Sequence, residues 1–215
     1  MIFAVYKPKG MTSNALLNRL RHAAGTKKIG HAGTLDPLAE GVLVVGVGRD
    51  ATKQLFQEVA KEKEYTAVIR FGMTSATDDE EGEKSESTYD TMPSRSEIQN
   101  VLQSFIGEIE QIPPIYSAVK IRGREAYKRA RSGELFELKS RHVIIKAIDV
   151  ISYEWPHLVL RVVTGPGVYI RSLARDIGEK LGVGGYLSQL VRTRVGHWRA
   201  EDALSLDEAM RRVVE

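Results

Sequence analysis

Residues 30–48 read GHAGTLDPLAEGVLVVGVG, and the two halves of this stretch have different properties. The first half is too rich in glycine and proline for a regular helix or strand. The second half, from Val42 to Val47, is a continuous apolar run of the kind found in a buried strand. The stretch therefore predicts an irregular loop that leads directly into the core of the protein.

Helices and strands are predicted on both sides of this stretch, and they do not alternate strictly. Periodicity of two indicates extended segments, and periodicity near 3.6 with capping residues indicates helices. This mixture favours an α+β fold with a mixed, mostly antiparallel sheet over a doubly wound parallel one. We expect extended segments at residues 2–6, 42–47, 64–71, 109–121, 143–153, 158–164 and 194–198, and helices at 13–24, 51–60, 95–106, 124–132, 169–181, 186–191 and from 206 onward.

Composition limits the class of protein. With 215 residues the chain can bury one sizeable core, and we expect a single catalytic domain over residues 1–215. The absence of cysteine excludes disulfides and thiolate metal sites and fits a reducing cytoplasm. No apolar run is long enough to span a membrane, the histidines are scattered singly, and there is no phosphate-binding or dinucleotide-binding loop. We therefore expect a cytoplasmic protein without a metal or cofactor.

The net charge of +3 hides an uneven distribution. Residues 78–90 are strongly acidic and predict a solvated loop, whereas residues 120–131 are strongly basic. Basic clusters of this kind are typical of nucleic-acid contacts, although a solvated face is the alternative. The cations that we expect on an RNA backbone are Lys120, Arg122, Arg124, Lys128, Arg129 and Arg131, together with Arg192, Arg194 and Arg199.

Asp36 is the first candidate for chemistry. It lies in the apolar setting Leu35-Asp36-Pro37-Leu38, and Pro37 restricts Asp36 to an extended conformation. A carboxylate on a stiff loop between apolar neighbours can serve as a nucleophile or a general base. The alternative is a turn in which the aspartate accepts a hydrogen bond from a backbone amide.

Three further residues are candidates beside Asp36. Arg171 lies at the start of a predicted amphipathic helix, where the helix dipole disfavours a cation, so we expect it to have a carboxylate or phosphate partner. Tyr65 lies at the entry to a strand and could stack on a base, or be an ordinary core aromatic. His31 precedes the Asp36 loop and is a structural residue in the simpler interpretation.

Six segments of the chain, in this order, resemble the TruB family of pseudouridine synthases, and the resemblance spans almost the whole chain. They are KPKGMTS (residues 7–13), GHAGTLDPLAEGVL (30–43), KEKEY (61–65), QIPPIYSAVKIRG (111–123), GVYIRSLARDIGEKLG (167–182) and LVRTRVG (190–196). The resemblance implies the pseudouridine synthase fold, with a mixed, mostly antiparallel sheet flanked by helices. It implies that the substrate is uridine 55 in the T-loop of tRNA.

The resemblance also implies roles for single residues. By motif match, Asp36 is the nucleophile, Tyr65 packs on the target uracil and Arg171 pairs with Asp36. Such a pairing would lower the pKa of Asp36 and oppose the effect of burial. The remaining matches are substrate-binding residues: His31, Tyr169, Leu190 and Lys7.

Departures from the family pattern and alternative functions accompany the resemblance. Ala32, Glu40 and Val168 stand where threonine is common, outside the proposed chemical groups. The chain also has no room for the C-terminal PUA domain that many relatives carry. Two alternatives stay open: a guide-RNA-directed pseudouridine synthase subunit, and an RNA-binding tRNA folding factor with incidental catalysis. We expect a monomer that binds the T-stem and loop of tRNA.

Overall fold

The computed structural model describes residues 1–214, and the chain divides into two compact units. Unit 1 comprises residues 1–66, 163–166 and the chain from 189 onward, and unit 2 comprises residues 67–162 and 167–188. The strands β4 (Lys63–Phe71), β11 (His157–Thr164) and β12 (Gly185–Val195) run from one unit into the other. The strand order is β1-β3-β12-β4-β11-β10-β7, with β2 beside β3 and β13 beside β12.

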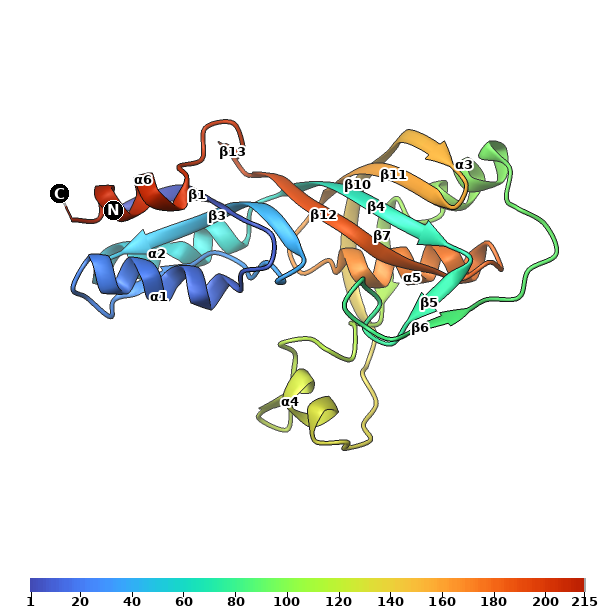
Figure 1. The fold of residues 1–215 in the computed structure, drawn as a ribbon, viewed down its shortest axis with the longest axis horizontal. Coiled ribbons are helices and arrows are strands. Elements are labelled where there is room, and N and C mark those ends of the chain that lie inside the picture. Colours follow the sequence, from blue (N-terminus) through green and yellow to red (C-terminus); the bar gives the residue numbers. More distant parts are fainter. Residues whose placement is uncertain (215) are drawn as a thin grey trace. The chain divides into compact units, whose positions relative to one another are not determined.

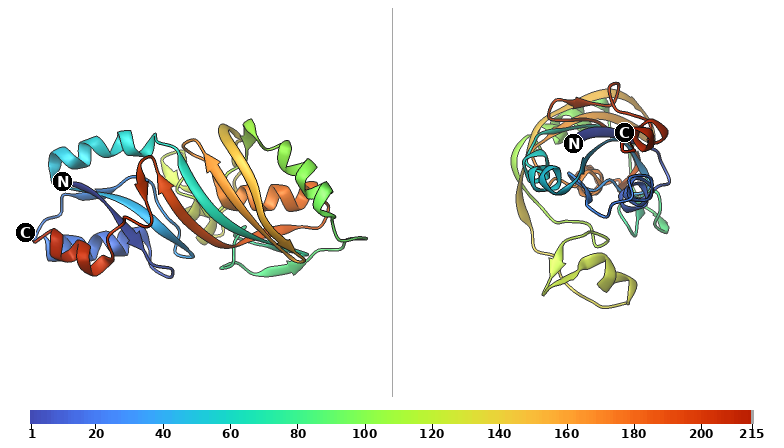
Figure 2. Two further views of the ribbon diagram at one scale, coloured as in Figure 1. Left: turned by 90° about the horizontal axis from the view of Figure 1, so that it is seen from above. Right: turned by 90° about the vertical axis from the view of Figure 1, so that its left-hand side faces the viewer.

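Unit 1 is built on a pair of antiparallel strands, with helices on both faces (Figures 1 and 2). Alternate residues of β1 point to opposite faces, so Phe3 and Val5 pack with the apolar sides of α1 and α6, whereas Ala4 packs with Leu55 of α2. The elements are β1 (Ile2–Lys7), α1 (Ser13–Ala23), β2 (Ile29–His31), β3 (Ala39–Val47), α2 (Arg49–Val59), β13 (Trp198–Arg199) and α6 (Leu206–Arg212).

Unit 2 holds the remaining strands and helices, with α5 and α3 as its main helices (Figure 1). Buried residues alternate along β4, where Ala67, Ile69 and Phe71 are 1% exposed, as the sequence predicts. The elements are β5 (Met73–Ser75), β6 (Lys84–Glu86), α3 (Arg95–Gln103), β7 (Gly107–Gln111), β8 (Lys120–Ile121), β9 (Arg124–Glu125), α4 (Ala126–Arg131), β10 (Arg141–Glu154) and α5 (Ile170–Lys180).

The fold class expected from the sequence is confirmed. Helices and strands mix in an α+β arrangement, and the pairs β1–β3, β2–β3 and β7–β10 are antiparallel, whereas β3–β12 is parallel. The helices expected from residues 95 and 206 begin with capping boxes at Ser94 and Ser205, each with the glutamate three residues later bonded back to the cap. Local signals therefore placed most elements correctly.

Two expectations are wrong. Residues 186–191 were expected to be helical, but they belong to the single long strand β12, which continues to Val195. The acidic stretch from residue 78 was expected to be solvated, but Lys84–Glu86 form β6, which pairs with β5. Asp79, within the same stretch, is only 2% exposed. The reason in both cases is long-range pairing, because Asp79 and Leu187 of β12 form a β-bridge.

Candidate active site

The loop that carries Asp36 is held in unit 1 by hydrogen bonds from two segments that precede it. Ser13, at the start of α1, uses its hydroxyl twice: Oγ donates to the Leu35 carbonyl and accepts from the Leu35 amide, both at 2.9 Å. The Gly10 amide donates to the Pro37 carbonyl at 2.7 Å. The backbone on both sides of Asp36 is therefore fixed, and its half-buried side chain projects from a rigid turn.

Lys7 holds the turn at residues 8–11, which contacts the Asp36 loop through Gly10. Its side chain is fully buried, and its ammonium donates to the carbonyls of Pro8 at 2.9 Å and Met11 at 2.6 Å. A fully buried side chain cannot reach a substrate in this conformation. The expected substrate contact of Lys7 is therefore corrected to a structural role in the turn whose Gly10 amide holds Pro37.

Arg192 is also buried, contrary to the surface position expected from the sequence. It was expected on an RNA backbone, but its side chain is 1% exposed and points into unit 1. Its Nε donates to Val42 at 2.7 Å, and its Nη2 donates to Gly33 at 3.1 Å. Burial excludes a phosphate contact here. The surface position was expected because basic residues are mostly exposed, and sequence alone does not reveal the carbonyls that accept from this one.

Tyr65, Arg192 and Asp36 influence one another electrostatically. Burial is the main cause that raises the pKa of Tyr65, Arg192 opposes this rise by charge and hydrogen bonding, and the charge of Asp36 adds to it. Burial lowers the pKa of Arg192, and Tyr65 and Asp36 counteract this change. Tyr65 is therefore a neutral phenol at neutral pH. The structure thus brings the predicted nucleophile and the predicted stacking residue within range of one guanidinium.

His31 and Leu190 belong to the same unit. Burial, followed by the charges of Arg192 and Arg21, lowers the pKa of His31, so its imidazole is neutral at pH 7. Its Nδ1 is buried without a hydrogen-bond partner. Leu190 lies two residues before Arg192 on β12, on the same side of the strand, and is 8% exposed. These positions fit the expected roles but do not test them.

Sequence reasoning missed Lys63, a second buried cation beside the Asp36 loop. It is 7% exposed, and its ammonium donates to the Val59 and Lys61 carbonyls, both at 2.8 Å. Its side chain lies against Gly33, because a Cβ at Gly33 would be 3.7 Å from Lys63 Cε. Burial, and then the charge of Arg192, lower the pKa of Lys63 to about 8. Only its place in the KEKEY segment could have drawn attention to it.

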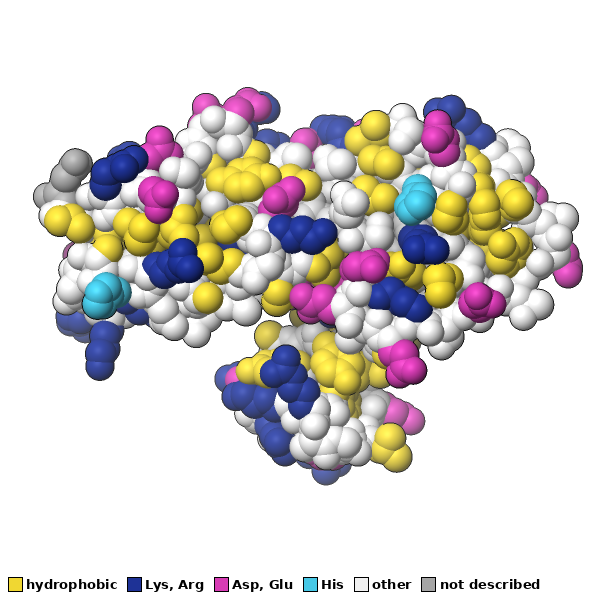
Figure 3. Space-filling view, in the orientation of Figure 1, with side chains coloured by type: hydrophobic (Ala, Val, Ile, Leu, Met, Phe, Trp, Pro, Cys, Tyr) yellow, Lys and Arg dark blue, Asp and Glu magenta, His cyan; other side chains and the backbone are white. Residues whose placement is uncertain are grey.

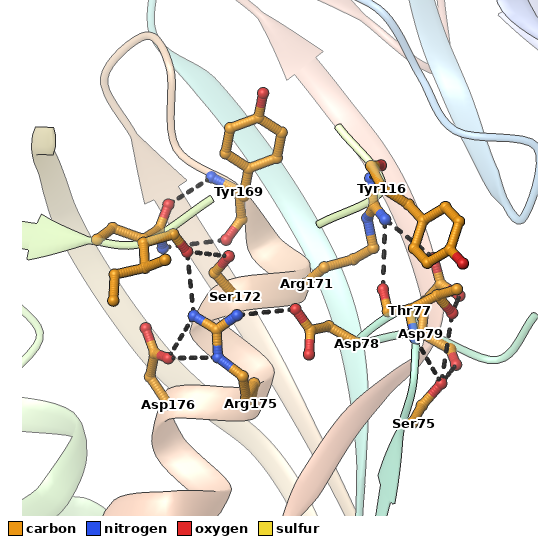
Figure 4. Close-up of polar contacts among 12 residues, drawn as sticks. Ser75, Thr77, Asp78, Asp79, Tyr116, Tyr169, Arg171, Ser172, Arg175 and Asp176 are labelled. Atoms are coloured by element: carbon orange, nitrogen blue, oxygen red, sulfur yellow. Dashed lines mark hydrogen bonds and ion pairs between the residues drawn. The ribbon is translucent and has the colours of Figure 1, made fainter. Parts of the chain in front are cut away.

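In unit 2, Arg171 has the carboxylate partner that its unfavourable helix position predicted (Figure 4). Its Nη1 lies 3.4 Å from Asp79 Oδ2 and 3.3 Å from the Thr77 carbonyl, and its Nη2 donates to Tyr116 at 3.0 Å. The side chain is buried. Arg171 therefore joins α5 to the turn after β5 and to the segment before β8.

Asp79 is the carboxylate that the sequence concealed. Its Oδ1 accepts hydrogen bonds from the Thr77 hydroxyl and from the Glu81 amide. These bonds hold the carboxylate in place independently of Arg171. Asp78 beside it pairs with Arg175 at 2.8 Å, one helical turn after Arg171 on α5 (Figure 4). Two adjacent aspartates, Asp78 and Asp79, therefore form ion pairs with two arginines on one face of α5. In the sequence these aspartates look like members of a solvated acidic run.

Tyr169 caps the start of α5, and its backbone is held by Gln111. The Gln111 side chain accepts from the Tyr169 amide at 2.8 Å and donates to the Tyr169 carbonyl at 3.1 Å. Its ring is half-buried and lies under the Arg141 guanidinium, 5.1 Å from ring centroid to Cζ. Gln111 is 1% exposed and was not predicted as a site residue, although it opens the QIPPIY segment.

The predicted basic cluster lies on β8, β9 and α4, where Figure 3 shows Lys and Arg side chains gathered. Its members Lys120, Arg122, Arg124, Lys128 and Arg131 are exposed. Arg129 is less accessible, because it pairs with Glu134 and donates to Ile121. Arg194 lies elsewhere, on β12, and pairs with Glu62 and Glu64, and Arg199 is exposed on β13.

Asp36 and Arg171 belong to different units, so their pairing stays a prediction. Within residues 1–214 there is no group of three or more His, Asp or Glu side chains that could hold a metal ion. No helix in the same range has the length and apolar character needed to cross a membrane.

Comparison with known proteins identifies the class. A family model described as TruB family pseudouridylate synthase, N-terminal domain, matches residues 21–170, and a model of the tRNA pseudouridylate synthase B C-terminal domain matches residues 171–214. A tRNA pseudouridine synthase B from Thermobifida fusca is 46% identical over 96% of this chain and 73% of the relative. One from Phocaeicola vulgatus is 46% identical over 94% of this chain and 88% of the relative.

Solved structures agree with the sequence comparisons. A chain in the crystal structure of a Cbf5-Nop10-Gar1 complex superposes with a TM-score of 0.73 and 31% identity. The superposition covers 98% of this chain, which spans about half of that one (53%). The fold and the matched segments therefore define a pseudouridylate synthase. Within that class, the chain belongs to the TruB family.

Proposed function

We propose that the protein isomerises uridine to pseudouridine in tRNA, at position 55 of the T-loop, as a single catalytic domain. The observation that carries this proposal is the rigid loop of Asp36, which lies within electrostatic range of Tyr65 and Arg192. The names of the relatives that match nearly the whole chain support it. No redox or energy input is needed, because the reaction exchanges one glycosidic bond for another.

The residues of this chain have separate tasks in the proposed reaction. The bond between N1 and C1′ breaks, the base turns, C5 bonds to C1′, and the C5 proton is replaced by one on N1. Asp36 is the nucleophile, acting at C6 of the base or at C1′ of the ribose. Tyr65 stacks on the flipped base, which recovers roughly 1–3 kcal/mol of the cost of unstacking. The C5 proton is accepted by the Tyr65 phenol oxygen or by water.

The decisive experiment follows tritium release from tRNA transcript labelled at C5 of uracil. We expect release by the wild-type protein without added guide RNA, and loss of at least about 10³-fold in rate for Asp36→Asn, as when other enzymes lose an essential nucleophile. Asp50→Asn, at an exposed position on α2, is the matched control and should keep wild-type activity. Absence of release by the wild type would contradict the proposed function.

The alternative functions give different results in the same assay. Release that needs a guide RNA would favour the guide-directed subunit. Unaltered release by Asp36→Asn would remove Asp36 as the nucleophile. Faster folding of tRNA without any release would favour the folding factor. A transcript that carries the label only at position 55 tests the substrate position, and sedimentation of the free protein tests the expected monomer.

We propose that the exposed cations of the basic cluster bind RNA phosphates. If they do, affinity for tRNA falls steeply with salt, because each neutralised phosphate contributes about −0.7 to −0.9 to the slope of log K against log salt. Replacing Arg122 and Arg131 with glutamine should flatten this slope by about two units. An unchanged slope would remove these two residues from the interface.

A further inference from the structure

The guanidinium of Arg192 is buried, and it contacts the loop that carries Asp36. It is among the largest fully buried side chains of the described residues, and it lies on β12, which pairs in parallel with β3. A buried guanidinium is strongly destabilising unless its donors are satisfied. Here Nε donates to Val42 of β3, Nη2 donates to Gly33, and Nη1 lies 3.5 Å from the Thr34 carbonyl. One side chain thus ties a core strand to the first residues of the loop.

The loop is shaped to receive this guanidinium. Gly33 has φ +91°, a conformation that residues with a side chain rarely adopt, and a Cβ there would lie 3.7 Å from Arg192 Nη1. Its carbonyl can therefore turn toward Arg192 while the chain continues toward Asp36. Arginine suits this position because its donors form a planar fork that addresses several acceptors at once. A lysine ammonium is a single point of charge and cannot reach both β3 and the loop.

The same guanidinium interacts with the Tyr65 side chain by hydrogen bonding and charge. Tyr65 and the Asp36 loop come from distant parts of the sequence. Arg192 links the two, since its Nη2 donates to the Gly33 carbonyl of the loop and its guanidinium acts on the pKa of Tyr65. The Asp36 charge also acts on the pKa of Arg192, so the carboxylate lies within range of the same group.

We propose that Arg192 is a positioning residue for the reaction: it fixes the distance between the Asp36 loop and Tyr65 without touching the substrate. This inference rests on the proposed function. Arg192 acts through the two groups that contact the base, so its loss disturbs the alignment of nucleophile and uracil. A displacement of about 1 Å in such an alignment can cost roughly 10²-fold in rate. Binding of the tRNA backbone does not depend on a buried side chain and is unaffected.

The test compares Arg192→Lys with Arg161→Lys, which makes the same substitution at an exposed strand position that pairs with Asp149. Tritium release gives kcat and KM, and filter binding gives Kd for unmodified tRNA. We expect kcat to fall by about 10²-fold for Arg192→Lys, with KM and Kd within about threefold of wild type. Arg161→Lys should match wild type in all three constants. Near-wild-type circular dichroism at the assay temperature ensures that folded protein is compared.

A double-mutant cycle with Tyr65→Phe separates positioning from a general loss of stability. If Arg192 acts through the Tyr65 hydroxyl, the double variant should lose much less than the product of the two single losses. Multiplicative losses, an unchanged kcat, or a rise in KM alone would each overturn the inference. If Arg192→Lys does not fold, Arg192→Gln gives the same comparison. Because wild-type release tests the proposed function separately, active wild type with unimpaired Arg192 variants would refute only the positioning role.

Discussion

Buried cations are handled differently in the two units. In unit 1, the charged groups of Lys7, Lys63 and Arg192 donate to backbone carbonyls, and Arg192 reaches the Asp36 loop at Gly33. In unit 2, the buried Arg171 and the half-buried Arg175 face the carboxylates of Asp79 and Asp78. Both arrangements give the buried cations hydrogen-bond or ion-pair partners.

The difference determines what each unit can do with its charge. A carbonyl is a dipole, so it satisfies a donor without cancelling the positive charge, whereas a carboxylate cancels the charge of its arginine. In unit 1, the charge of Arg192 therefore interacts with Asp36 and Tyr65. The paired charges of unit 2 add little field and instead fasten α5 to the neighbouring turn. Three changes test this comparison, from the largest expected effect to the smallest.

The first change is Asp79→Asn, which removes the charge that faces Arg171 but keeps an oxygen for Thr77 and Glu81. Arg171 is then left as a buried charge without this carboxylate. Breaking a buried pair from one side typically costs about 3–5 kcal/mol, so we expect the free energy of unfolding in urea to fall by that amount. Activity should fall as well, since Arg171 is a proposed catalytic residue.

Asp149→Asn is the control for this change, because its pair with Arg161 is exposed and should contribute less than about 1 kcal/mol. Equal losses for Asp79→Asn and Asp149→Asn would show that the burial of the Arg171 pair has no special weight. The contrast between the two units would then lose its basis.

The second change is Lys63→Met. The pH dependence of its effect on the free energy of unfolding tests what it costs to bury a cation whose partners are backbone carbonyls. The pKa of Lys63 is lowered from 10.5 to about 8 in the folded protein. Between these values the unfolded chain binds the proton and the folded protein does not, so folding is favoured as pH rises. Below about pH 8 both states are charged and this contribution is constant. The wild type should therefore gain up to about 3 kcal/mol relative to Lys63→Met as pH rises from about 8 to 10.5.

Urea unfolding of both proteins across this pH range measures the difference directly. Lys53→Met, at an exposed position on α2, is the control and should show no comparable trend. A stability difference between wild type and Lys63→Met that stays flat with pH would mean that Lys63 keeps its proton on folding.

The third change compares the two capping boxes, Ser94→Ala in unit 2 and Ser205→Ala in unit 1. Each serine accepts from the amide of a glutamate three residues on, at 3.3 Å. Both sites are exposed, so the surrounding unit should not matter, and each loss should be about 1 kcal/mol in thermal or urea unfolding. Losses that differ by more than about twofold would indicate that the two units unfold separately rather than together.

Local signals predicted much of the fold. The alternation along β4, the apolar run of β3 and both capping boxes are properties of adjacent residues, so they can be recognised without knowing the tertiary partners. Strand β12 was missed because it is buried over much of its length, and its buried Arg192 looks in the sequence like part of a polar face. The buried state of that residue depends on Val42, which lies 150 positions earlier in the chain.

The proposed chemical groups come from the sequence, whereas the residues that support them come from the structure. Asp36, Tyr65 and Arg171 were found through the resemblance of their segments, and Arg171 also through its unfavourable helix position. Asp79 was assigned to a solvated run because charge can be read from sequence whereas burial cannot. Arg192 was assigned to RNA for the same reason, since a cation that satisfies carbonyls has no local signature, whereas Lys7 was assigned by motif match.

The parallel pairing of β12 with β3 has a consequence for how the protein is made. The ribosome extrudes the chain from its N-terminus, so the Asp36 loop emerges before Arg192, which lies 150 positions after its partner Val42. Contacts between such distant positions form late in folding. A nascent chain therefore exposes Asp36 before Arg192 can hold its loop in place.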